Sequence, residues 1–118
     1  MLFRSERIRL VKSSLYKDLK FPSNKIKVIK FSSLTTTLCK KFNSNIILRG
    51  LRAVSDFEYE FLMTGMNRSI DKDIETIFLM SSEKYHFISS RFIKEIHKLG
   101  GDISKSVPKP VLDFLSKI

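Results

Sequence analysis

The sequence predicts an α/β fold with a parallel sheet covered by helices. Segments whose apolar residues recur at helical spacing alternate with short apolar runs along the 118-residue chain, and turn residues separate the two kinds of segment. Alternation of this kind is typical of parallel sheets with helices on their faces. Only three strands are predicted, so we expect the other strands of a doubly wound sheet to lie before Met1.

Three elements are predicted before residue 45. A helix, a strand and a second helix are expected in turn over residues 5–15, 25–31 and 34–42. Apolar side chains recur at three- or four-residue steps in both helices, and lysine alternates with apolar residues in the strand. On the first helix we expect Ile8, Val11 and Leu15 to share one face. Serines that can cap the helices are Ser5, Ser32 and Ser33.

The rest of the chain is organised around residues 46–60. Residues 46–48 are all apolar and predict a short buried strand. The next four residues, Arg-Gly-Leu-Arg, are expected to form a turn that opens a helix. Apolar residues recur at helical spacing from Val54 onwards, and the predicted helix continues towards Arg68.

Two arginines, Arg49 and Arg52, fall at this junction between strand and helix. A helix N-terminus offers free backbone N–H groups to an anion, and guanidinium groups are forked donors suited to phosphate. The sequence therefore indicates a phosphate site here. The alternative is a solvated surface turn, because Arg-Gly-x-Arg by itself is a weak motif.

The second half of the chain predicts one more strand and two more helices. Residues 75–80 form a bounded apolar run that predicts a strand. A helix is expected to begin at Ser89 or Ser90 and to end at residues 100–101, which are both glycine. The last helix is expected from about Pro110.

A second candidate phosphate site comprises residues 85–91, just after the last predicted strand. The hydroxyl groups of Ser89 and Ser90 and the N–H groups of a helix start can hold phosphate, and Lys94 follows one turn later. The alternatives are that the serines only cap the helix and that Lys94 lies on a solvated helix face.

Few residues have the chemistry of a metal or nucleophilic site. His86 and His97 are the only histidines and Cys39 is the only cysteine, so no metal-ligand cluster is predicted. Cys39 cannot form an internal disulfide and is expected to be a packing residue in a reducing compartment. The carboxylates within residues 56–60 alternate along a helix and point in different directions, so no acid–base pair is expected.

The net charge of +10 indicates an anionic partner. Nucleic acid and a phosphorylated small molecule both fit this charge. The basic residues are scattered, without a polybasic tail, zinc-finger spacing or an aromatic RNA-binding motif. No apolar run approaches the ~20 residues that span a bilayer. A diffuse positive surface with one phosphate pocket explains the charge equally well.

The longest of these patterns closely resembles the signature of bacterial phosphopantetheine adenylyltransferases. The string Ile-Leu-Arg-Gly-Leu-Arg-Ala-Val-Ser-Asp-Phe-Glu-Tyr-Glu at residues 47–60 is far more specific than any of its parts. The resemblance covers essentially the whole chain. Further matching segments are residues 66–68, 75–80, 87–90, 94–95, 101–103 and 107–108.

This resemblance implies a Rossmann-like nucleotidyltransferase fold and a reaction. The family transfers an adenylyl group from ATP to 4′-phosphopantetheine, giving dephospho-coenzyme A and pyrophosphate, with Mg²⁺. It implies a cytoplasmic hexamer whose ligands are ATP and 4′-phosphopantetheine, with no nucleic-acid or membrane partner. Residues 1–118 are then expected to form a single domain that corresponds to the C-terminal part of an adenylyltransferase.

The resemblance also assigns site residues. Arg49 and Thr35 are expected to bind the phosphopantetheine substrate. Residues expected to bind ATP are Gly50, Leu51, Arg52, Glu60, Tyr85, His86, Phe87, Ile88, Ser89, Ser90 and Arg91. His86 and Arg91 depart from the family, which usually has small hydroxyl residues at their positions.

No catalytic residue and no metal ligand is assigned within this chain. The family's His-x-Gly-His motif, which carries its main transition-state stabiliser, and its upstream substrate lysine have no counterpart here. We therefore expect an N-terminal βαβ portion to be missing and the 118-residue chain alone to show no adenylyl transfer. The alternative function is a non-catalytic remnant that binds nucleotide or coenzyme A.

Overall fold

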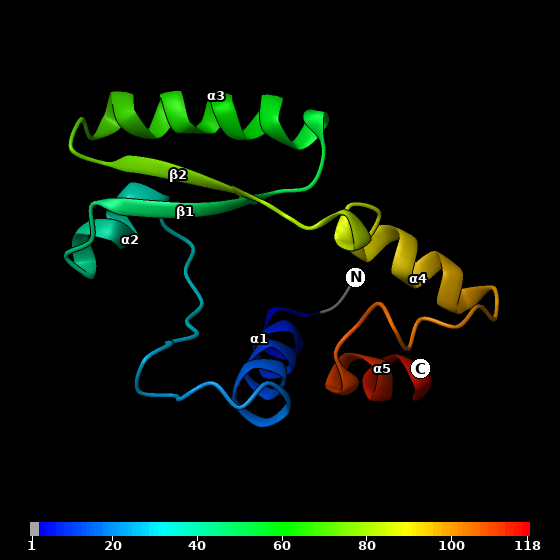
Figure 1. Ribbon diagram of the computed structural model, residues 1–118. Coiled ribbons are helices and arrows are strands. Elements are labelled where there is room, and N and C mark those ends of the chain that lie inside the picture. The colour runs from blue at the N-terminus through cyan, green and yellow to red at the C-terminus, as the bar shows by residue number, and fades with distance from the viewer. Residues whose placement is uncertain (1–2) are drawn as a thin grey trace. The chain divides into compact units, whose positions relative to one another are not determined.

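The computed structural model describes residues 3–118, which divide into two compact units (Figure 1). The sheet unit comprises residues 31–87 and the helical unit comprises residues 3–30 with 88–118. The division into two compact units does not test the prediction that residues 1–118 form a single domain, which stays a prediction. None of the described helices is both long and apolar enough to cross a membrane.

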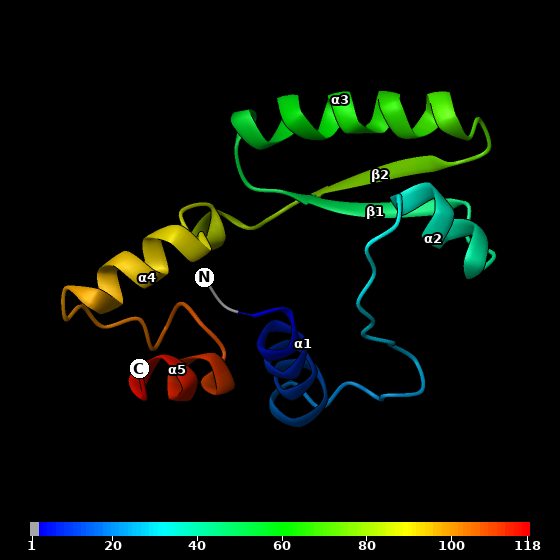
Figure 2. The same ribbon diagram turned by 180° about the vertical axis from the view of Figure 1, so that it is seen from behind.

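The sheet unit is a parallel pair of strands with connecting helices. Strand β1 (Ile46–Leu51) pairs with β2 (Glu75–Met80), and helix α3 (Val54–Ile70) connects them. The register runs from Ile46 opposite Glu75 to Leu51 opposite Met80. Figure 2 shows α3 lying along the two strands, with the short helix α2 (Thr35–Lys41) leading into β1. The predicted parallel α/β arrangement is thus confirmed for this unit.

Helix α3 covers one face of this sheet and leaves the other bare. The Phe57 ring meets the Phe78 ring edge-on, with 6.1 Å between centroids. Side chains alternate between the faces of a strand, so the residues flanking Phe78 point away from α3. Residues 46–48 form a strand as predicted, but the prediction that this strand is buried is wrong, because the face away from α3 has no cover among the described residues. Its exposed apolar side chains are Ile46, Leu48, Ile77 and Leu79.

The helical unit contains four helical segments and a small core formed by side chains of residues 88–115. The segments are α1 (Arg4–Lys12), the π-helical segment Ser13–Asp18 that continues it, α4 (Ser90–Lys98) and α5 (Lys109–Ser116).

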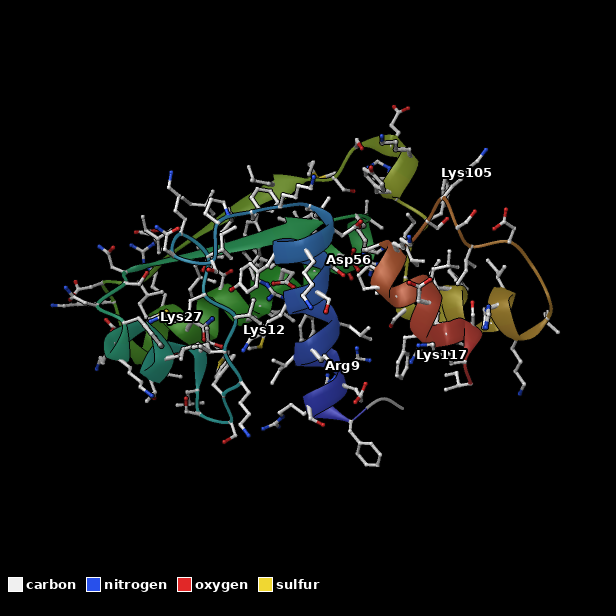
Figure 3. The ribbon with its side chains drawn as sticks, turned by 90° about the horizontal axis from the view of Figure 1, so that it is seen from below. Arg9, Lys12, Lys27, Asp56, Lys105 and Lys117 are labelled. Atoms are coloured by element: carbon white, nitrogen blue, oxygen red, sulfur yellow. The ribbon has the colours of Figure 1, made fainter. Side chains whose placement is uncertain are left out.

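Three buried side chains form the centre of this core: Ile93, Ile103 and Leu115. The π-helical segment packs against α5, and the Arg9 guanidinium of α1 lies 5.7 Å from the centroid of the Phe114 ring. Arg9 and its neighbour Lys12 are labelled on α1 in Figure 3.

The glycine end of α4 is as predicted. Gly100 adopts φ +85°, a left-handed conformation that favours glycine, and the Gly101 N–H donates to the carbonyl of Ile96 at 2.8 Å. A Cβ at Gly101 would lie 2.5 Å from the Ile96 side chain, so the close return of the chain also requires glycine there. The free carbonyls at the end of the helix are thereby satisfied.

The strand and the serine caps predicted before residue 45 are not formed. Residues 25–31 form no strand, because none of the described residues supplies a partner strand for their backbone. The serine caps also fail: α1 begins after Phe3 and α2 after Leu34, neither with a side-chain cap. Ser5 lies inside α1, and the Ser33 hydroxyl donates to the Leu34 carbonyl instead.

The first helix also turns a different side inward. Leu10 and Ser14 are buried, whereas Val11 is exposed and Ile8 and Leu15 are only half-buried. The prediction that Ile8, Val11 and Leu15 share the inward face is therefore wrong for Val11. The change to π-helical geometry after Lys12 shifts the helical phase, so a constant 3.6-residue period no longer describes the face.

The turn predicted at Gly50 lies two residues later. Gly50 is a strand residue paired with Leu79, and β1 continues to Leu51, which is buried. Only Arg52 and Ala53 separate β1 from α3. Arg49 therefore lies within the strand, and Arg52 alone lies at the junction.

Candidate phosphate site

The centre of the sheet unit is an ion pair between a strand and a helix. Arg49 of β1 donates from Nε to Glu60 Oε2 at 2.8 Å and from Nη2 to Glu60 Oε1. This is a two-point contact between the planar guanidinium and the carboxylate. Glu60 is the one buried residue among those of α3. A helix that presents exposed apolar side chains along most of its length is therefore tied to the sheet through a charge.

The pair lies in a small polar pocket of about 210 Å³. Thr35, at the first turn of α2, lines the same pocket. The structure thus brings together Arg49 and Thr35, the two residues expected to bind substrate, and adds Glu60, which was expected to bind ATP. The other lining residues are Ile47, Tyr59, Met63, Thr64, Asn67 and Thr76.

The electrostatics of the pair fix its charge state. The hydrogen bonds from Arg49 lower the pKa of Glu60 below its ordinary value, against the opposing effect of burial. The hydrogen bonds to Glu60 raise the pKa of Arg49 further above its already high value. Both side chains are therefore charged at neutral pH. Half of the Arg49 side chain is exposed, whereas only 11% of the Glu60 side chain is exposed.

Acidification is expected to weaken the sheet unit through Glu60. Because the pKa of Glu60 is lowered on folding, its stabilising contribution is complete above the ordinary value of 4.5 and is lost as the pH falls through the lowered value. We expect the thermal unfolding midpoint, followed by circular dichroism, to fall below about pH 4.5. The fall should be smaller in Glu60→Gln. Equal pH dependence in both proteins would contradict this expectation.

Arg52 is held at the start of α3 by Asp56. Asp56 Oδ2 accepts from the Arg52 backbone N–H at 3.2 Å and from its Nε at 3.3 Å. Asp56 is labelled in Figure 3 and lies in the first turn of α3, where a carboxylate is favoured by the helix dipole. Asp56 and Glu60 thus bond to different arginines. The larger effect of Arg49 lowers the pKa of Glu60, although the negative charge of Asp56 also acts on Glu60, in the opposite direction.

The second candidate cluster, residues 85–91, is divided between the two units. In the sheet unit, Tyr85 ends the short 3₁₀ helix Glu83–Tyr85, and His86 Nε2 donates to the Ser81 carbonyl at 3.0 Å. Phe87 is 84% exposed. Residues 88–91 belong to the helical unit, where Ser89 precedes α4 as its N-cap and Ser90 and Arg91 are its first residues.

Ser89 caps α4 as predicted, with its hydroxyl accepting from the Phe92 N–H at 3.2 Å. Ser89→Ala is expected to lower the free energy of unfolding of the helical unit by about 1 kcal/mol, because one N–H of the first turn loses its partner. Urea unfolding measures this loss. The exposed neighbour Ser90 is the matched control, since the same change there removes no cap; equal losses would contradict the capping role.

A larger cleft of about 790 Å³ lies between α4 and α5 in the helical unit. Ser89, Ser90, Lys94 and Lys98 line it together with apolar side chains of both helices. The predicted cluster of serines and Lys94 is therefore assembled on one cleft. His97 of the same helix is engaged, because its Nε2 donates to the Leu115 carbonyl at 2.9 Å.

The donor set gives little support for a resident metal ion. Among residues 3–118, no three His, Cys, Asp or Glu side chains gather closely enough to hold one. Asp56 and Glu60, the carboxylates beside the two arginines, already accept hydrogen bonds from them. Magnesium is commonly held by substrate phosphates and waters with one or two carboxylates.

Sequence reasoning missed the pairing of Arg49 with Glu60 and the polar lining around it. One signal was available: Glu60 follows Phe57 by three residues, so both lie on one helical face. Because Phe57 contacts the sheet, a carboxylate one turn later is directed towards the sheet as well. Tyr59, Asn67 and Thr76, which line the pocket, had no comparable signal.

Comparisons with known proteins agree on one relationship. The family model described as cytidylyltransferase-like matches residues 3–96. A phosphopantetheine adenylyltransferase of Pelagibacter ubique is 60% identical over 117 residues, which cover 98% of this chain and 71% of that protein. One of Acidiphilium cryptum is 50% identical over 109 residues, covering 92% of this chain and 64% of that protein.

These matches confirm the Rossmann-like nucleotidyltransferase fold expected from the sequence, in agreement with the parallel β1–α3–β2 unit. They extend across both described units and include every candidate residue of the sheet unit. The chain therefore belongs to the phosphopantetheine adenylyltransferase family, within the wider cytidylyltransferase-like group.

Proposed function

We propose that this chain serves the transfer of an adenylyl group from ATP to 4′-phosphopantetheine, which gives dephospho-coenzyme A and pyrophosphate in coenzyme A synthesis. The observation that carries the proposal is 60% identity over 98% of the chain to a phosphopantetheine adenylyltransferase. The pocket that contains both Arg49 and Thr35 supports it, because these are the residues expected to bind the phosphopantetheine substrate.

The reaction needs no nucleophile from the protein. A phosphate oxygen of phosphopantetheine attacks the α-phosphorus of ATP, a new phosphoanhydride bond forms, and pyrophosphate leaves. The protein's contribution is to position the two substrates and to balance the charge that develops on the phosphates. Arg49 would bind the attacking phosphate, and Arg52, at the start of α3, would lie near the phosphates of ATP.

Further parts of the proposal follow from the family. Gly50, Leu51, Arg52, Glu60 and residues 85–91 are proposed to bind ATP. Magnesium would accompany the ATP phosphates and offset their charge. We also propose a cytoplasmic location and assembly into a homo-oligomer, a hexamer as in the family. The bare apolar face of the β1–β2 sheet supports assembly, because large exposed apolar patches mark interaction surfaces.

Calorimetry and a turnover assay on the 118-residue chain test the proposal. We expect 4′-phosphopantetheine and magnesium–ATP to bind, and pantetheine without its phosphate to bind much more weakly. Binding of both ligands without pyrophosphate release is the expected result for the 118-residue chain alone. Pyrophosphate release that requires both substrates would show that this chain is itself an active transferase and would overturn the expectation that it is inactive alone. Failure of both ligands to bind, with affinity for nucleic acid that falls steeply with salt, would contradict the proposal.

A further inference from the structure

The Arg49 guanidinium has two edges that can each hold an oxyanion, and one is already occupied. Nε and Nη2 donate to the two oxygens of Glu60. No described residue accepts from Nη1. The end-on edge formed by Nη1 and Nη2 therefore keeps donors for a second ligand. Half of the Arg49 side chain is exposed, so this edge can be reached from solvent.

Glu60 is the fixed partner of this pair. It lies in the middle of the 17-residue helix α3, and its own carbonyl accepts from the Thr64 hydroxyl at 2.8 Å. Its side chain is only 11% exposed. A two-point contact with a fixed carboxylate orients the guanidinium plane as well as holding its charge. The flexible arginine is thus held in place by the helix.

The surroundings of the pair are suited to a phosphate monoester. Thr35, Thr76 and Asn67 line the same pocket, and their side chains carry hydroxyl and amide groups that can donate hydrogen bonds. A phosphate here would gain the charged edge of Arg49 and these neutral donors. The Glu60 carboxylate repels a second bound anion, so the phosphate is restricted to the edge of the guanidinium that faces away from Glu60.

We propose that Glu60 is a positioning residue that acts through Arg49: it occupies the side-on edge of the guanidinium so that the end-on edge receives the substrate phosphate. This inference rests on the proposed function, since the phosphate is that of 4′-phosphopantetheine. It assigns Glu60 a role on the substrate side, beside the ATP role that the family resemblance implies. Loss of Glu60 should therefore weaken phosphate binding, although the Glu60 carboxylate does not contact the phosphate.

The test compares Glu60→Gln with Glu58→Gln. Glu58 is an exposed carboxylate on the same helix, so both variants change the net charge equally. We expect Glu60→Gln to weaken 4′-phosphopantetheine binding about ten-fold or more by calorimetry, the effect of losing one charge-assisted contact. Glu58→Gln should bind as the unchanged chain does. Binding of pantetheine without phosphate should be equally weak in all three proteins.

A nuclear magnetic resonance readout separates positioning from a merely structural tie. The Arg49 Nε–H signal, assigned by its loss in Arg49→Lys, should be slow to exchange in the unchanged chain and exchange-broadened in Glu60→Gln.

A double substitution tests whether the two residues act together. In the Arg49→Lys background, Glu60→Gln should no longer alter phosphopantetheine affinity, because the two residues act as one unit. If Glu60→Gln fails to fold, Glu60→Asp provides the test, since the shortened carboxylate keeps the charge but can no longer reach both nitrogens.

The outcomes distinguish the inference from the proposed function. If the unchanged chain does not bind 4′-phosphopantetheine, the proposed function is wrong, and the role of Glu60 in positioning Arg49 for the phosphate is wrong as well. If the unchanged chain binds and a folded Glu60 variant binds equally well, the proposed function stands and the positioning role is overturned. An equal loss in Glu58→Gln would also overturn it, because the effect would then be one of net charge.

Discussion

Arg49→Ala is expected to abolish detectable 4′-phosphopantetheine binding and to destabilise the sheet unit by about 1–3 kcal/mol. The binding loss follows from removal of the charged group proposed to meet the phosphate. The stability loss follows because the carboxylate of Glu60 is left nearly buried without its partner. Calorimetry measures the first effect and urea unfolding the second.

The matched control for this change is Arg68→Ala. Arg68 also pairs with a carboxylate, that of Glu75 at 3.3 Å, but both side chains are more than half exposed. An exposed pair of this kind contributes about 0–1 kcal/mol. We expect Arg68→Ala to leave binding intact and to change stability little. Equal effects of the two substitutions would show that neither burial nor position distinguishes Arg49.

Leu115→Ala is expected to destabilise the helical unit by about 2–5 kcal/mol. Leu115 of α5 is 6% exposed and packs with Ile93 and Ile103 at the centre of the core. Truncation removes buried apolar surface and leaves a cavity that the neighbouring helices fill only in part. The midpoint of thermal unfolding, measured by circular dichroism, should fall accordingly.

Leu99→Ala is the control for the core substitution. Leu99 follows α4 in the same unit but is 81% exposed, so we expect its change to be within about 0.5 kcal/mol. The same three carbon atoms are deleted from one side chain in the core and from one in solvent. A loss at Leu99 as large as that at Leu115 would mean that the described core does not hold the unit together.

Local patterns predicted some elements of this fold well. Residues 75–80 were predicted as a strand with the bounds that β2 has, because polar residues bracket a continuous apolar run. The helix from Ser89 to the two glycines was also predicted, since capping and left-handed termination depend on neighbouring residues alone. Cys39 is buried, as expected of a packing residue.

Predictions failed where pairing between distant segments decides the structure. Gly50 was expected in a turn, but hydrogen bonding to the six residues of β2 carries β1 through it to Leu51. Residues 25–31 have a strand pattern without a described partner strand, so the pattern alone could not make a strand. Non-local pairing is invisible to a reading of periodicity.

The sequence predicted which residues belong to the candidate site but not how they are arranged. The sequence indicated Arg49 and Arg52 at a strand–helix junction, yet Arg49 lies within the strand and faces Glu60 eleven positions later. Only Arg52 and Ala53 connect β1 to α3, and periodicity alone does not show which strand residue the apolar face of the helix meets. The spacing of Glu60 from Phe57 indicates only a shared helical face, and the structure shows that this face is turned towards Arg49.

The single buried charge of α3 also constrains how this sequence can change over generations. A mutation at position 49 alone leaves a carboxylate in a sheltered site without its partner, and a mutation at position 60 alone frees the arginine to move. Either single step carries a cost in stability that simultaneous replacement of both residues would avoid. Positions 49 and 60 are therefore expected to be inherited as a unit, and lineages that replace one should also replace the other.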